Sequence, residues 1–140
     1  FRLITPLSDM NLLKNEEKNY LKNAGIILKP YISDPYKYYY NTMVLIIPTS
    51  YGEGLSRIIL EMIHLEIPIL STRNQGTEEI LPLNYKYFIS SNNPALIANK
   101  LLMLLENINE CRETISTTKS NIKDRYSSKI SNHTFKNFLY

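Results

Sequence analysis

Two glutamates stand on either side of a predicted helix start in the stretch VLIIPTSYGEGLSRIILEM, Val44 to Met62. Glu53 lies in a loop that follows an unbroken apolar run, and Glu61 comes eight positions later inside a segment with a helical pattern. Carboxylates accept hydrogen bonds from hydroxyl groups, and the free amides at a helix start hold phosphate oxygens. The arrangement therefore suits a ligand that carries both hydroxyls and phosphates.

The spacing leaves two interpretations of Glu61. It lies about a turn and a half into the helix, where a ribose would sit if phosphates lay at the helix start. Gly54 permits the close approach of backbone that such a ligand needs. Alternatively, Glu61 is exposed and forms an ordinary pair with Arg57 on a solvated face that also carries His64.

The elements that position these residues alternate between short apolar runs and helix-patterned segments, which predicts strand–helix units and a parallel sheet. The predicted strands cover residues 2–5, 26–29, 44–47, 67–71 and 85–89. The third has no polar face, as is typical of a central strand covered on both sides. Ligands bind beyond the carboxyl ends of such strands, and the loops 48–55 and 72–76 are both expected there.

The predicted helices cover residues 9–23, 35–41 and 56–65, a short segment after Thr77, and three further segments from Pro94 onward, around 94–108, 110–126 and 128–139. Ser8 or Asp9 caps the first helix, and Gly25 ends it in a left-handed turn. Thr77 is the predicted cap of the short helix, whose first turn holds Glu78 and Glu79 at the positive end of the helix dipole. We divide the chain into residues 1–95, which hold the sheet, and 96–140, which form the C-terminal helices of the same domain.

Composition excludes several classes of protein. The chain has 140 residues, 44% of them hydrophobic, which is enough for the core of one domain. Its net charge of +3 is scattered, so nucleic acid is not an expected partner. Cys111 is the only cysteine and has no neighbours at metal-ligand spacing, so no metal site, no internal disulfide and a reducing, cytosolic setting are expected. No apolar run approaches the ~20 residues of a membrane helix.

The stretch IIPTSYGEGLSRIILEM, followed by IPILST and QGTEEIL, resembles the C-terminal half of retaining glycosyltransferases of the GT-B type, in particular family 4, also called group 1. The resemblance is nearly continuous from Met43 to Leu81 and extends more loosely through NNPALIANKLLMLLEN. It implies an α/β fold with a Rossmann-like parallel sheet flanked by helices and a helical C-terminal tail. The chain begins FRLIT, without a methionine, so we expect a part of a longer protein that lacks the first strand of this domain.

The resemblance also implies roles for individual residues. Glu53, the catalytic-site residue, contacts hydroxyls of the donor sugar, and Glu61 holds the ribose hydroxyls of the nucleotide. Backbone amides around Gly54, Leu55 and Ser56 face the sugar and the diphosphate. Further pocket residues implied by the resemblance are Tyr51, which lines the cleft, and Gly76 and Thr77, which form the neighbouring turn. Glu79 occupies an acidic position of the family, although a charge at a helix start is an equally good interpretation.

The sequence departs from the family pattern at three places. Ser56 stands where proline is frequent, and Gln75 replaces one glycine of a Gly-Gly turn. The basic residues that clamp the diphosphate in the family lie upstream of the segment that matches. We also expect the N-terminal domain, which binds the acceptor in the family, to lie outside this sequence, so the isolated chain is expected to be inactive.

The expected function is the donor-binding part of a retaining glycosyltransferase in polysaccharide or glycoconjugate biosynthesis. Its expected partners are a nucleotide sugar such as a UDP- or GDP-sugar, an acceptor glycan or lipid-linked saccharide, and the missing acceptor domain. No cofactor or metal is expected, and membrane contact is at most peripheral, at the inner face of the cytoplasmic membrane. Two alternatives remain: a nucleotide-binding subunit of a split transferase, and a nucleotide-sugar epimerase of the same fold. Phe135, Phe138 and Tyr140 either pack on a second domain or close this domain's core.

Overall fold

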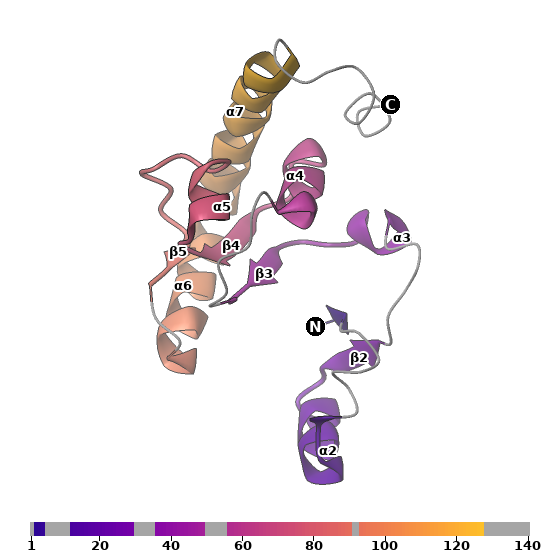
Figure 1. The fold of residues 1–140 in the computed structure, drawn as a ribbon. Coiled ribbons are helices and arrows are strands. Elements are labelled where there is room, and N and C mark those ends of the chain that lie inside the picture. Colours follow the sequence, from indigo (N-terminus) through magenta and orange to yellow (C-terminus); the bar gives the residue numbers. More distant parts are fainter. Residues whose placement is uncertain (1, 5–11, 30–35, 50–55, 91–92, 128–140) are drawn as a thin grey trace. The chain divides into compact units, whose positions relative to one another are not determined.

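A computed structural model describes residues 2–4, 12–29, 36–49, 56–90 and 93–127 of the chain. Strands and helices alternate along the sequence, as the apolar pattern predicts (Figure 1). The chain divides into two units, Phe1–Tyr38 and Tyr39–Tyr140. The α/β class with parallel strands and flanking helices is confirmed in both units.

The described residues of the first unit include a pair of parallel strands and a helix of nine residues. Strands β1 (Arg2–Ile4) and β2 (Ile27–Lys29) pair in parallel, with Leu3 opposite Leu28. Helix α2 (Asn15–Asn23) lies between them in the sequence. The short helix α3 (Tyr36–Tyr39) spans the boundary between the two units.

The end of α2 follows its sequence closely. Gly25 has φ of 76°, a left-handed conformation that costs glycine little. Its N–H donates to the Lys22 carbonyl, and the Ile26 N–H donates to the Leu21 carbonyl at 2.9 Å. These two bonds satisfy carbonyls that the helix end would otherwise leave unpaired. The predicted left-handed turn at Gly25 is therefore confirmed.

The start of α2 differs from the prediction. A continuous helix over residues 9–23 is wrong, because residues 13 and 14 are not helical. The helix begins after Lys14, whose backbone N–H donates to a Glu17 carboxylate oxygen at 2.7 Å. This bond satisfies the amide of the cap residue, as in a capping box, and it fixes the start of the helix at that point.

The second unit contains a three-stranded parallel sheet. Strands β3 (Leu45–Ile47), β4 (Ile69–Thr72) and β5 (Phe88–Ile89) lie in the order β3-β4-β5. All four residues of β4 are buried, whereas Ile46 of β3 is 39% exposed. In this sheet β4 is the middle strand and β3 lies at one side. For the strand pairings that the structure describes, the prediction that residues 44–47 form a central strand covered on both sides is therefore wrong.

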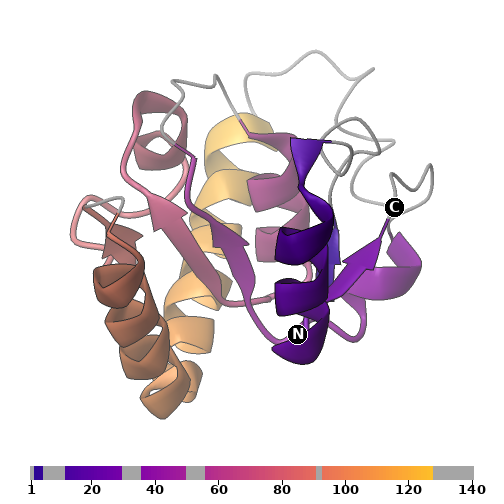
Figure 2. The same ribbon diagram turned by 90° about the horizontal axis from the view of Figure 1, so that it is seen from below.

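Among the described residues, the helices after β3 are α4 (Arg57–His64), α5 (Gln75–Glu78), α6 (Pro94–Glu106) and α7 (Ile108–Ser127). Helix α6 contacts β4 and β5, and α7 packs against both α4 and α6. Figure 2 shows α7 and α4 side by side behind the strands. The predicted helix over 110–126 is confirmed with an earlier start, and the one predicted over 128–139 lies outside the described residues.

The core of the second unit is apolar and joins the sheet to the helices. On α4 the fully buried residues Ile59, Met62 and Ile63 follow the three- and four-residue spacing of one helix face. They form one cluster with Ile69 and Leu70 of the central strand. Further members of the cluster are Leu104 of α6 and Cys111 and Ile115 of α7. This packing fixes the orientation of α4 relative to β4, and hence the positions of the polar residues on it.

Candidate functional site

The carboxyl ends of β3 and β4 lie next to each other. The two strands are parallel and paired, with Ile47 opposite Ser71. Beyond these residues the Thr72 hydroxyl donates to the Thr49 carbonyl in a short hydrogen bond. The prediction that the segments after these strands meet at one edge of the sheet is therefore confirmed at residues 49 and 72.

Four of the predicted site residues, Tyr51, Glu53, Gly54 and Leu55, lie outside the described residues. Their assigned roles stay predictions. The other four are described: Ser56 and Glu61 belong to the start and the middle of α4, and Gly76 and Thr77 belong to α5.

Helix α4 begins at the predicted place. Ser56 is its N-terminal cap residue, with an extended backbone, and the Leu60 N–H donates to the Ser56 carbonyl. The Ser56 side chain makes no capping hydrogen bond. Proline is therefore not needed at this position for the helix to start, and the first-turn amides of α4 form its positive end.

Glu61 is the fifth residue of α4 and lies on its buried side. Only 9% of its surface is exposed, although carboxylates are seldom buried without a partner. The Tyr39 hydroxyl donates to Glu61 Oε2 at 2.8 Å, and Tyr39 is itself 7% exposed. The alternative in which Glu61 lies exposed on a solvated face with Arg57 is therefore wrong with respect to its exposure, although Arg57 itself is exposed.

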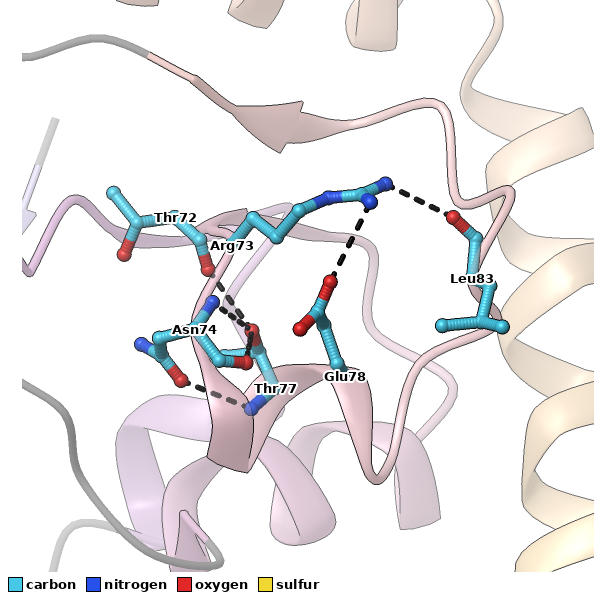
Figure 3. Close-up of polar contacts among 6 residues, drawn as sticks. All are labelled: Thr72, Arg73, Asn74, Thr77, Glu78 and Leu83. Atoms are coloured by element: carbon cyan, nitrogen blue, oxygen red, sulfur yellow. Dashed lines mark hydrogen bonds and ion pairs between the residues drawn. The ribbon is translucent and has the colours of Figure 1, made fainter.

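The turn after β4 is held by a closed set of hydrogen bonds (Figure 3). Asn74 Oδ1 accepts from the Thr77 N–H at 3.0 Å, and the Asn74 N–H donates to Thr77 Oγ1 at 3.0 Å. The Thr77 hydroxyl in turn lies 3.0 Å from the Thr72 carbonyl and 2.9 Å from the Asn74 carbonyl, so its single proton is shared between them.

This turn corrects two predictions. Asn74 is the cap of α5, and Thr77 is its third residue, because the two side chains satisfy each other's backbone amides in the manner of a capping box. Glu79 follows the last residue of α5 and is exposed, so its placement in the first turn of that helix is wrong. Gly76 and Thr77 are buried within the turn.

Arg73 is a residue that the sequence did not single out. Its guanidinium donates to the Leu83 carbonyl at 2.9 Å, lies 3.4 Å from the Glu78 carboxylate and stacks 4.8 Å above the Phe88 ring. Figure 3 shows the side chain reaching across the turn between Glu78 and Leu83. Arg73 therefore braces α5 against the segment that leads to β5. The sequence shows only that a basic residue follows a predicted strand. The three partners of Arg73 are brought to it by the tertiary structure, so the sequence pattern could not identify them.

A second polar cluster lies at the opposite end of the sheet. The Tyr85 hydroxyl donates to the carbonyl of Ile69, the first residue of β4, at 2.5 Å and lies 3.4 Å from Cys111 Sγ. Burial raises the pKa of the Tyr85 phenol and of the Cys111 thiol, so both stay protonated and neutral near pH 7. Because this cluster is at the amino end of β4, it belongs to the core and lies away from the carboxyl end of the strand.

Two kinds of feature, a metal-binding cluster and a membrane-spanning helix, concern the described residues as a whole. Within these parts of the chain, His, Cys, Asp and Glu side chains do not gather in any group of three that could bind a metal ion. A helix both long and apolar enough to cross a membrane is likewise not found in the portions that the structure describes.

Comparison with known proteins places the chain in a family. The family profile of glycosyl transferases group 1 matches residues 8–121. A capsular polysaccharide biosynthesis glycosyltransferase of Staphylococcus aureus, CapM, is 28% identical over 120 residues. That match covers 82% of this chain and 31% of CapM, so the chain spans about a third of the length of this relative. No solved structure matches the chain significantly.

The family match includes β3, α4 and α5, and the last two of these elements carry the described site residues Glu61, Gly76 and Thr77. The chain therefore belongs to the glycosyl transferases group 1.

Proposed function

We propose that this chain is the donor-binding portion of a retaining glycosyltransferase, which transfers a sugar from a nucleotide-sugar donor to an acceptor hydroxyl. The observation that carries the proposal is the buried carboxylate of Glu61 on α4, which accepts a hydrogen bond from Tyr39. A structural helix gains nothing from a carboxylate among Ile59, Met62 and Ile63, because burial of a charge is costly. A ligand with hydroxyl groups gives that carboxylate a use.

The geometry of α4 supports a nucleoside diphosphate. Its first-turn amides suit phosphate oxygens. Glu61 lies four residues after Arg57, the first residue of the helix, and is therefore about 6 Å further along the helix axis. A ribose attached to a phosphate at the helix start reaches a carboxylate at that depth. In this proposal Glu61 accepts from the ribose hydroxyls, and the backbone of Ser56 and the preceding Gly54 and Leu55 faces the diphosphate.

The remaining assignments follow from the family resemblance. Glu53 contacts hydroxyls of the donor sugar and is not a covalent nucleophile, since it does not face the anomeric carbon. Tyr51 lines the cleft, and the turn at Gly76 and Thr77 shapes its neighbouring wall. Rate enhancement comes from positioning of donor and acceptor and from neutralising the leaving diphosphate, without a required metal.

The acceptor site belongs to sequence outside the match. The aligned part is 31% of CapM, and the proposal assigns acceptor binding to the remaining portion of such a protein. The name of this relative supports a role in polysaccharide biosynthesis. The family resemblance adds to the proposal an acceptor glycan or lipid-linked saccharide, used at the inner face of the cytoplasmic membrane with at most peripheral contact. The alternative function, a nucleotide-binding subunit of a split transferase whose acceptor site is on a separate subunit, requires the same nucleotide binding by this chain.

Calorimetric titration with UDP, GDP and their sugars tests the proposal. Glu61→Ala should weaken binding of every nucleotide, whereas Glu53→Ala should weaken only ligands that carry a sugar. Glu113→Ala, an exposed glutamate on α7, is the matched control and should bind like the unmodified chain. No binding by the unmodified chain at millimolar concentration would overturn the proposal. Sugar transfer by the 140-residue chain alone would overturn the requirement for a separate acceptor site.

A further inference from the structure

Tyr39 is the partner of Glu61 from a different part of the chain. It is the last residue of α3, 22 positions before Glu61, and is 7% exposed. Its hydroxyl lies 2.8 Å from Glu61 Oε2. An ionised carboxylate only accepts hydrogen bonds, so the phenol must be the donor in this pair.

We propose that Tyr39 is a positioning residue for donor binding, which fixes the Glu61 carboxylate in the orientation that accepts the ribose hydroxyls. The inference rests on the proposed function of Glu61. Tyr39 acts through Glu61 and does not itself contact the ligand.

The chemistry of the pair permits this role. A carboxylate has roughly four acceptor positions, and one phenol donor uses one of them. Glu61 can therefore hold Tyr39 and still accept from hydroxyl groups of a ligand. A glutamate side chain that is already fixed also loses less conformational entropy when the ligand binds, and this raises affinity without a new contact to the ligand.

The tyrosines around Tyr39 make the assignment specific and supply a control. In the sequence YKYYY, Tyr36 is 50% exposed and Tyr40 is 82% exposed, whereas Tyr39 is buried. A structural tyrosine in this segment would need only its ring in the core. The hydroxyl of Tyr39 instead reaches the one buried carboxylate among the described residues.

The test compares Tyr39→Phe with Tyr40→Phe in calorimetric titrations of UDP and GDP and of their 2′- and 3′-deoxy analogues. Tyr39→Phe should weaken ribonucleotide binding roughly 10-fold, the scale of one hydrogen bond to a charged group. The same variant should lose little affinity for a deoxy analogue that lacks the hydroxyl which Glu61 holds. Tyr40→Phe should leave all affinities unchanged.

Several outcomes would overturn the inference. Equal weakening of ribo and deoxy ligands would show that Tyr39 is structural only, and unchanged ribonucleotide affinity would show that its hydroxyl does not position Glu61. In either case binding that still depends on Glu61 would leave the proposed function standing. If the unmodified chain binds no nucleotide, the proposed function fails and the inference fails with it.

A double variant keeps the test decisive if Tyr39→Phe does not fold. Tyr39→Phe combined with Glu61→Gln removes the buried charge that would be left without its donor, and so restores the fold. If Tyr39 acts through the carboxylate, this double variant should bind ribonucleotides as Glu61→Gln alone does. A double variant that binds at least several-fold more weakly than Glu61→Gln would overturn the inference, since Tyr39 would then act by another route.

Discussion

The turn after β4 and the buried side of α4 use their polar groups differently. In the turn after β4, Asn74 and Thr77 satisfy each other and the Thr72 carbonyl, so the network closes within six residues. On α4, Glu61 is a buried acid that accepts a hydrogen bond from Tyr39, a residue of another element. A closed network is sufficient as an explanation of its own residues, whereas the cost of burying a carboxylate on a helix is explained by the ligand of the proposed function.

The comparison separates stability from binding. Changes in the turn after β4 should lower the free energy of unfolding and leave ligand discrimination intact. Changes at Glu61 should lower ligand affinity more than they lower stability. Four substitutions test this difference, in order of decreasing expected effect.

Glu61→Ala should have the largest effect, and mainly on binding. Two hydrogen bonds from ribose hydroxyls to a charged group are together worth about 3 kcal/mol, which corresponds to a roughly 100-fold loss of nucleotide affinity. The free energy of unfolding should change by only about 1 kcal/mol, because the lost Tyr39 bond is offset by removal of a buried charge. Calorimetry and urea unfolding measure the two quantities. A stable variant that binds nucleotide as tightly as the unmodified chain would contradict the comparison.

Thr77→Val should reverse that pattern. Valine keeps the shape of the buried side chain but leaves the Asn74 N–H without its acceptor and removes the proton shared by two carbonyls. The free energy of unfolding should fall by about 2 kcal/mol, the cost of an unsatisfied buried polar group. The preference for ribose over deoxyribose should not change. A lost ribose preference without a change in urea midpoint would mean that the Thr77 hydroxyl contacts the ribose and not only the fold.

Asn74→Ala tests the cap that the sequence assigned to Thr77. Removal of an asparagine cap costs about 1 kcal/mol, and Asn74 is only partly buried, so the loss should be smaller than for Thr77→Val. Thermal unfolding measures it. Equal stability of Asn74→Ala and the unmodified chain would show that Thr77 alone holds the start of α5.

Sequence reasoning succeeded where the controlling interactions are local. The parallel strands, the left-handed Gly25 turn and the start of α4 after Ser56 each depend on apolar periodicity or on a single turn residue. The Gly25 turn, the start of α4 and the first four strands were predicted to within two residues, whereas β5 begins three residues later than predicted. The adjacency of the segments after β3 and β4 followed from the same pattern, because parallel strands bring their carboxyl ends to one edge.

Sequence reasoning failed where several residues can form the same local structure, or where a residue's hydrogen-bond partner is distant in the sequence. Asn74 and Thr77 are both good caps, and only the reciprocal bonds between them decide that Asn74 precedes the helix. In the same way, the hydrogen bond from the Lys14 N–H to Glu17 fixes the start of α2 directly after Lys14, which the sequence pattern did not predict. The Tyr39 contact with Glu61 spans 22 positions, and no local spacing rule connects them.

Arg73→Lys should give the smallest effect and is the most sensitive check on the turn. Lysine keeps the charge near Glu78 but loses the planar stacking over Phe88 and the guanidinium geometry that reaches the Leu83 carbonyl. Because the Arg73 side chain is 49% exposed, the loss should be only about 0.5 kcal/mol in urea unfolding. Nucleotide affinity should stay unchanged, since each of these three partners belongs to the fold. A severalfold loss of affinity with unchanged stability would instead make Arg73 a phosphate contact, and the turn after β4 would then share the binding role of α4.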